Sequence, residues 1–445
     1  MKIIMKNKIA IPGILLSGLL LLGISSCSKD DFKGERPDQK LTAALESYSI
    51  LLTEAPHGWK AHLFTGSVGG YGFWFEFNKE NKVSMFADFR TESGNQAAQS
   101  SYRLKATLLP ALYFDTYSYL HELADPDNRV NGGTAGWGLL SDFEFSFREV
   151  KGDTILLTGN LNNSKLQLVK ASAAEKAAYQ RGNLNALRAD ATRFFQTSSF
   201  LFLKDNANTV YSVNMNISQK TVAFNYSVGQ TMETALLGFA FSGENDLILS
   251  EPFIKGGIHI DRFIRTEVAG APVIKAALAK ETMEIQKTEN PLFPFFLMWG
   301  SSYQLIRVPI ETTSQGNKSD FDLRRTAALT AMRALLRAGT TFPEMRIAIN
   351  KSEKLVVVNQ IIRQTPYSFN ANFAFSYTEQ DNAIKLKYEG PMDGNSTVIE
   401  PGFKPIIDGL TDGAMEFDFD LTTPQLRAFG QSKSLTNFRF VGLIN

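Results

Sequence analysis

Three separate stretches of the chain alternate apolar and polar residues over two neighbouring segments. Alternation of this kind buries one face of a strand and leaves the other in water, and the polar turn between the segments is typical of a β-hairpin. The sequence therefore predicts antiparallel sheet in three places. The apolar positions are Phe73, Phe75, Phe77, Val83 and Met85, then Val213, Met215, Ile217, Val222, Phe224 and Tyr226, and last Phe373, Phe375, Tyr377, Ile384, Leu386 and Tyr388.

A helix is predicted before each hairpin. The second helix follows Ser172, which has capping-box spacing to Glu175. The third follows Ser319 with Asp322 and ends at Gly339, a residue type common just after a helix. Apolar residues at helical spacing mark the first and third helices: Leu41, Ala44, Leu45, Tyr48 and Leu52, and Leu329, Met332 and Leu336.

These patterns predict an α+β fold of three units, each with one helix and an antiparallel β-sheet. The boundaries are residues 38–171, 172–318 and 319–445. The first two units also end on similar segments, Leu166–Lys170 and Tyr303–Arg307. Two interpretations stay open: a true threefold repeat, or helix and hairpin patterns that arose independently.

The N-terminus has the pattern of a bacterial lipoprotein signal. Three lysines precede an apolar run, Ile9–Ile24, which is interrupted by proline and glycine and is too short to span a membrane. Small residues and Cys27 follow. We expect residues 1–26 to be a signal peptide, Cys27 to receive lipid such as palmitate, and residues 27–37 to form a lipidated flexible tether. The alternative is an uncleaved N-terminal anchor.

The residues after Cys27 resemble the export signal of Bacteroidota lipoproteins. They are Ser28, Lys29, Asp30 and Asp31. The resemblance implies a lipid-anchored protein of the outer membrane that faces the cell exterior. The membrane would then be a partner through the lipid on Cys27.

Charge and cysteine content exclude several functions. Without residues 1–26, lysine and arginine fall from 46 to 43 against 45 acidic residues, a formal charge of −2. No basic cluster longer than Arg324–Arg325 is present, so we expect no nucleic-acid partner. Cys27 is the only cysteine, which leaves the folded part without a disulfide, a thiolate metal site or a cysteine nucleophile. No cofactor is predicted, because the glycine-rich Gly69–Gly72 is not followed by a helical pattern.

The most distinctive stretch is residues 108–147. It contains Phe114-Asp115-Thr116-Tyr117, Tyr119-Leu120-His121, Asp125-Pro126 and Asp142–Phe147, and Gly58-Trp59 and Gly69-Gly70-Tyr71 lie upstream. Together these motifs resemble a Bacteroidota surface lipoprotein family, the domain of unknown function number 4302. The resemblance implies no enzyme activity. It implies genes near SusC-like transporters, SusD-like lipoproteins and a zinc metallopeptidase.

The same stretch holds the candidate catalytic residues. Phe143, Phe145 and Phe147 are expected to line a buried strand face, while Asp142, Glu144 and Ser146 face the other way. Asp142 and Glu144 could form an acid and base pair or a cation site, but a solvated strand face is the favoured interpretation.

Metal binding is predicted to be absent. His121-Glu122 begins like a zinc metalloprotease motif, but Asp125 stands where the second histidine is required. The oxygen-rich Asp125–Gly133 could hold calcium, but its spacing differs from an EF-hand and a plain turn is favoured. His57 and His62 are spaced for opposite sides of a strand, so a shared metal is not expected.

The four tryptophans could stack on sugars if they are exposed, or fill cores. They are Trp59, Trp74, Trp137 and Trp299. Trp74 lies on the strand face opposite Phe73 and Phe75, so it is exposed if that face is wet and buried if the sheet is covered on both sides.

The sequence therefore favours a non-catalytic accessory or ligand-binding component of a SusC/SusD-like nutrient uptake system. A TonB-dependent transporter and a SusD-like lipoprotein are the partners that the resemblance implies. Two alternatives stay open: a stand-alone glycan- or peptide-binding surface protein, and an unrecognised hydrolase that uses Asp142, Glu144 or His121.

Overall fold

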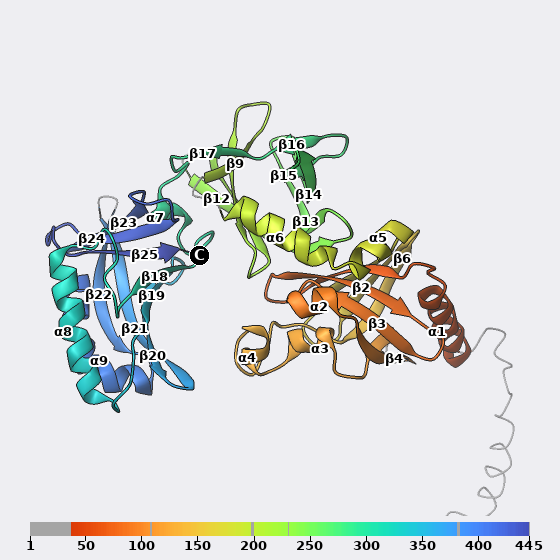
Figure 1. The fold of residues 1–445 in the computed structure, drawn as a ribbon, viewed down its shortest axis with the longest axis horizontal. Helices are drawn as coiled ribbons and strands as arrows, with labels where there is room; N and C mark the ends of the chain where they lie inside the picture. Colours follow the sequence, from red (N-terminus) through yellow and green to blue (C-terminus); the bar gives the residue numbers. More distant parts are fainter. Residues whose placement is uncertain (1–36, 107–108, 197–199, 230, 381–382, 445) are drawn as a thin grey trace, which may run out of the picture.

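The computed structural model describes residues 37–106, 109–196, 200–229, 231–380 and 383–444 (Figure 1). It contains three antiparallel sheets, and the sheet of the middle unit lies between the other two in the figure. The described residues are 23% helix and 47% strand, which confirms the predicted α+β class. Within the described residues, no helix combines the length and the apolar character that crossing a membrane requires.

The first sheet closes on itself because β1 pairs with both β2 and β8. Its core is rich in phenylalanine, including Phe73, Phe75 and Phe145, which are fully buried. Its strands are β1 (Trp59–Phe64), β2 (Gly70–Phe77), β3 (Lys82–Ala87), β4 (Ala98–Ala106), β5 (Pro110–Phe114), β6 (Glu144–Lys151), β7 (Thr154–Gly159) and β8 (Lys165–Lys170). Its helices are α1 (Pro37–Thr53), α2 (Thr91–Asn95), α3 (Tyr119–Ala124) and α4 (Asn128–Asn131).

The second sheet follows two helices, α5 (Ala173–Gln180) and α6 (Asn183–Phe195). Its strands are β9 (Phe200–Lys204), β10 (Val210–Asn216), β11 (Thr221–Val228), β12 (Thr231–Ser242), β13 (Asp246–Lys255), β14 (Ile258–Val268), β15 (Ala271–Ala277), β16 (Thr282–Glu284) and β17 (Gln286–Thr288). Only Ile285 separates β16 from β17, but β16 pairs with β15 and β17 pairs with β9. One short segment therefore occupies both edges of this sheet.

The third sheet closes through the pairing of β18 with β19 and β25. After α7 (Phe295–Met298), its elements are β18 (Leu305–Pro309), α8 (Ser319–Leu335), β19 (Glu344–Asn350), β20 (Leu355–Gln364), β21 (Tyr367–Gln380), β22 (Ala383–Pro391), α9 (Gly394–Thr411), β23 (Ala414–Asp420), β24 (Arg427–Ser432) and β25 (Arg439–Ile444). The order strand, helix, three strands thus occurs twice. The two long helices pack together on the outer side (Figure 1), and Gly402 permits this because a Cβ there would lie 2.7 Å from the Met332 backbone nitrogen.

The three predicted hairpins are confirmed as β2–β3, β10–β11 and β21–β22. The Ser172–Glu175 capping box is also confirmed at the start of α5. The third helix differs in detail, because Lys318 is its N-cap and makes no side-chain cap bond, and the helix ends at Leu335. Asp322 instead accepts hydrogen bonds from Thr313, Asn317 and Arg325.

The interpretation of Tyr303–Arg307 as the end of the second unit is wrong. Residues 305–309 form β18, which is hydrogen-bonded within the third sheet. The change from one sheet to the next thus falls between Thr288 and Leu305, rather than at the predicted boundary of residues 318 and 319. An apolar-polar alternation identifies a strand but not its partner, so local pattern could not settle this. Independent folding of the three units stays a prediction.

The first two sheets pack closely through β2 and β12. Gly70 and Gly72 face the backbone of Phe239 and Phe241, and a Cβ at Gly72 would overlap the Phe241 carbonyl. Trp74 points to the same side, is buried in the core of the second sheet, and donates from Nε1 to the His57 carbonyl at 2.9 Å. This part of the first sheet is therefore covered on both faces.

Candidate functional site

Asp142 is a structural residue rather than a member of a solvated face. Its carboxylate is buried and accepts hydrogen bonds from the backbone N–H groups of Leu161, Asn162 and Ser164 and from the Ser164 hydroxyl. The prediction that it faces water is wrong, because the loop after β7 folds over it. A carboxylate with this many local donors fixes a loop conformation.

The environment of His121 is also local. Its Nδ1 lies 3.1 Å from the Ser118 hydroxyl and its Nε2 lies 3.1 Å from the Phe114 carbonyl. The Phe143 ring stacks on it at 4.7 Å and is 38% exposed, so the prediction that Phe143 shares the buried face of Phe145 is wrong. The strand begins only at Glu144. No hydrogen bond joins His121, Asp142 and Glu144 to one another in the described chain.

The oxygen-rich segment after α3 uses its oxygens within the loop. Asp125 accepts from the Tyr117 hydroxyl at 2.5 Å and from the Asp127 N–H at 2.9 Å. Asp127 is paired with Arg129, and Asn131 donates to two backbone carbonyls. Elsewhere in the described ranges, no group of three or more His, Cys, Asp or Glu side chains is placed to hold a metal ion.

The tryptophans divide into three buried and one exposed. Trp59, Trp74 and Trp299 are buried in the three cores, whereas Trp137 is 67% exposed. Three of the four candidate sugar-stacking platforms are therefore core residues. Cys27 and the export-signal residues Ser28–Asp31 lie outside the described residues.

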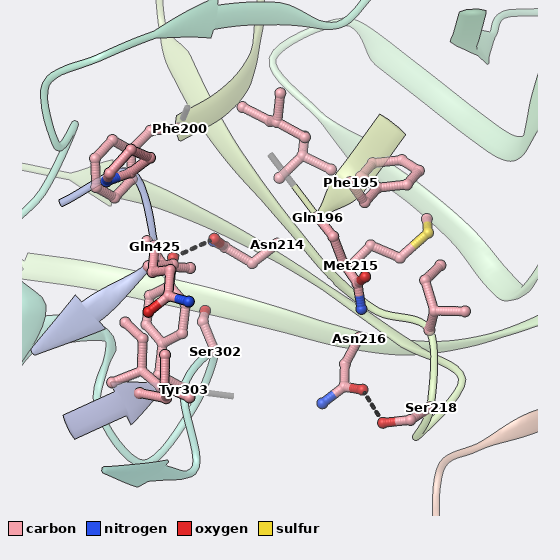
Figure 2. A pocket seen from close by; sticks show the side chains of 17 residues that line it. Phe195, Gln196, Phe200, Asn214, Met215, Asn216, Ser218, Ser302, Tyr303 and Gln425 are labelled. Carbon is pink, nitrogen blue, oxygen red and sulfur yellow. Dashed lines mark hydrogen bonds between the residues drawn. The ribbon is translucent and has the colours of Figure 1, made fainter. Parts of the chain in front are cut away.

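The strongest candidate site is a cavity of about 580 Å³ where the second and third units meet (Figure 2). One wall comes from the end of α6, the strands β9 and β10, and the turn after β10. The other comes from the residues just before β18, the loop between β23 and β24, and the end of β25. Cavities of this size are typical of small-molecule sites. Sequence analysis did not identify it.

The side chains that line this cavity carry no formal charge. Amides, hydroxyls and apolar groups make up all 17 lining residues. Two of the polar groups are fixed across the boundary between the units: the Tyr303 hydroxyl donates to Asn214 Oδ1 at 2.7 Å, and Ser302 donates to Asn225 Oδ1 at 2.8 Å. Burial raises the pKa of Tyr303, so its phenol stays neutral.

Two exposed amides in the lining of the cavity are available to a ligand. Gln196 follows α6 and Gln425 lies in the β23–β24 loop, and both side chains are exposed. Neither side-chain amide has a hydrogen-bond partner among the residues that the structure describes. Buried apolar side chains also line the cavity, among them Phe200, Leu201 and Val213.

A buried histidine joins the first two sheets and was also not predicted. His62 Nε2 lies 2.6 Å from Ser242 Oγ, and its Nδ1 lies 3.4 Å from Gln167 Oε1. The pair resembles a serine nucleophile with its base, but both side chains are buried in the packing between β1 and β12 and neither lines the cavity. Burial lowers the pKa of His62 to about 4.

We therefore expect acid to weaken this junction. The folded pKa of His62 lies below the ordinary 6.5, so the neutral form stabilises the fold at high pH and the stability is lost as pH falls from 6.5 toward 4. The loss should reach about 3 kcal/mol in the free energy of unfolding. Denaturant unfolding at a series of pH values measures it. A His62→Gln variant should lose this part of the pH dependence, and an unchanged slope would contradict the prediction.

The comparisons with known proteins identify a family, and they give only weak matches to solved structures. No curated protein matches the chain. The octameric penicillin-binding protein homologue from Pyrococcus abyssi matches at 8% identity and a TM-score of 0.15, over 35% of this chain and 37% of that one. A β sliding clamp from C. crescentus matches at 11% identity and a TM-score of 0.13, over 91% of this chain and 96% of the clamp. The DnaN sliding clamp from Bartonella birtlesii matches at 8% identity and a TM-score of 0.13, over 90% and 97%.

These scores are too low to support an argument about fold or function. The family comparison is stronger, because residues 29–267 match a family model described as "Domain of unknown function (DUF4302)". The match spans more than half of the chain and includes the distinctive stretch of residues 108–147. This chain therefore belongs to the DUF4302 family.

Proposed function

We propose that this protein binds a neutral ligand in the cavity between its second and third units and has no catalytic activity of its own. The observation that carries the proposal is the lining of amides, hydroxyls and apolar groups without a formal charge. An ion buried there would lose its hydration without gaining a counter-charge, which is costly. A neutral molecule with hydrogen-bonding groups avoids that cost.

The lining also supports binding rather than catalysis. General acid–base and nucleophilic reactions need groups that titrate or are activated near neutral pH. Tyr303 is the one titratable side chain among the 17 lining residues, and burial moves its pKa further from neutrality. The hydrolase alternative has no further support, because Asp142 and His121 are held by separate local partners.

We place this binding function at the cell surface. Lipid on Cys27 would anchor the chain to the outer membrane, and residues 28–36 would separate the lipid from the start of α1 at Pro37. Capture of a neutral nutrient beside a SusC-like transporter and a SusD-like lipoprotein is the arrangement that we favour. The supports are the lipoprotein pattern and the resemblance described above.

A substitution that narrows the cavity tests whether the ligand binds there. Leu443 lines it and is 43% exposed, so Leu443→Trp should narrow the cavity without disturbing the core. We expect neutral compounds to bind the wild-type chain. Leu443→Trp should weaken their affinity by about tenfold or more, which is about 1.4 kcal/mol. Isothermal titration calorimetry against neutral and charged compounds is the measurement.

Leu161→Trp is the matched control, because Leu161 is 83% exposed and belongs to the first unit. It should bind like the wild type. Preference for charged compounds, or equal affinity in Leu443→Trp, would contradict the proposal.

A further inference from the structure

We infer that the neutral ligand of this cavity is a saccharide; the inference rests on the proposed binding function and specifies its ligand class. Two features of the cavity lead to it: the exposed amides of Gln196 and Gln425, and the aromatic side chain of Phe195 in the lining.

The free amides match sugar hydroxyls. A primary amide presents donors and an acceptor side by side, and a hydroxyl both donates and accepts. Gln196 comes from the second unit and Gln425 from the third, and Figure 2 shows them at separate places around the cavity. Asn216, the last residue of β10, instead uses its amide within the following turn, where Ser218 donates to its Oδ1 at 2.8 Å. A polyhydroxylated ligand can therefore bond to both units at once.

The aromatic side chains supply the second requirement. Phe195 lines the cavity and is partly exposed, whereas Phe200 is buried and packs edge-on against Phe419 at 4.8 Å. A sugar ring has an apolar face of C–H groups that packs against such rings, while its hydroxyls point outward from the rim. The lack of charge in the lining favours neutral sugars over acidic ones.

A bound peptide strand is the alternative ligand for this site. Extended peptides commonly add to an unpaired sheet edge, where main-chain bonds supply the affinity. At this cavity β9 lies between β10 and β17, β10 lies between β9 and β11, and β25 lies between β24 and β18. Among the described residues, however, the lining residues 213–216 of β10 are paired only with β11. A peptide strand would add at this edge, so the test includes a peptide probe set.

The test uses the purified full-length chain with two probe sets, an array of neutral oligosaccharides and a set of neutral peptides. Gln196→Met and Gln425→Met keep the side-chain length and remove the amide at exposed positions, so the fold should persist. We expect saccharide binding that each variant weakens at least tenfold. Gln99→Met, at an exposed position of β4 in the first unit, should bind like the wild type.

Three results would overturn the inference in different ways. Binding of neutral peptides without saccharides, blocked by Leu443→Trp, would replace the ligand class and leave the proposed function standing. Failure of both probe sets to bind would remove the proposed function together with this inference. Saccharide binding that is insensitive to both glutamine variants and to Leu443→Trp would place the sugar elsewhere on the molecule and also overturn the inference.

Discussion

Cys27→Ala is expected to move the protein from the membrane fraction to the soluble fraction. A lipid-modified cysteine is the single membrane attachment that the sequence predicts, and alanine at this position cannot accept an acyl chain. Burial of each acyl CH₂ contributes about 0.8 kcal/mol, so loss of the chains should release nearly all of the protein. Fractionation of the native host, together with incorporation of labelled palmitate, measures the effect.

Ser28→Ala is the matched control, because it changes the neighbouring residue and keeps the acceptor cysteine. It should stay in the membrane and incorporate label. Retention of Cys27→Ala in the membrane fraction, without label, would instead favour the uncleaved N-terminal anchor.

The wild-type chain and the Cys27→Ala variant also test the proposed partnership. Affinity capture of the tagged wild-type chain from gently solubilised outer membranes should recover a TonB-dependent transporter and a SusD-like lipoprotein, identified by mass spectrometry. Cys27→Ala should recover much less of both. Recovery of the wild-type chain alone, with surface display confirmed, would contradict a stable complex and would leave ligand capture as an independent activity.

The secondary structure was largely readable from the sequence because it depends on local pattern. Period-two alternation located the hairpins β2–β3, β10–β11 and β21–β22, and a capping box located the start of α5. What alternation could not supply was the partner of each strand. The pattern of residues 305–309 fits the end of one sheet and the start of the next equally well. Only their pairing with β19 and β25 places them in the third sheet.

The sequence pattern also could not show whether another part of the fold covers the polar face of a strand. The pattern around Trp74 could not show that a second sheet covers it, because the covering strand β12 lies far along the chain. The prediction that Asp142 faces solvent is wrong for the same reason, because the loop that buries its carboxylate comes later in the chain, after β7.

The candidate site was beyond sequence analysis because its walls meet only in the folded molecule. Residues 195–196, 200–201 and 213–218 form one side, and residues 302–303, 424–426 and 443–444 form the other. Neither segment contains a recognisable motif, and uncharged amides and hydroxyls are common on any surface. The informative property is the combined lining, which exists only once the second and third units are in contact.

The largest stability effect is expected at a buried ion pair between the first and second sheets. Lys220 Nζ lies 2.7 Å from Asp88 Oδ2, and both side chains are almost fully buried. Lys220 occupies the turn between β10 and β11, and Asp88 follows β3. Burial lowers the pKa of Lys220, while the Asp88 charge opposes that change. The Phe241 N–H also donates to Asp88 at 3.0 Å, and the Phe241 ring lies 4.4 Å from the Lys220 nitrogen.

Lys220→Met is expected to destabilise the fold by about 3–5 kcal/mol, because it leaves the Asp88 carboxylate buried without its counter-charge. Asp88→Asn should cost a similar amount by stranding the ammonium group. The double variant should be clearly more stable than the sum of the two losses predicts, since it buries no charge at all. Denaturant unfolding of the four proteins forms a double-mutant cycle.

Lys404→Met is the control, because the ion pair between Lys404 and Asp408 is exposed and its loss should cost under about 1 kcal/mol. Equal losses in Lys220→Met and Lys404→Met would show that the Asp88–Lys220 pair does not hold the two sheets together.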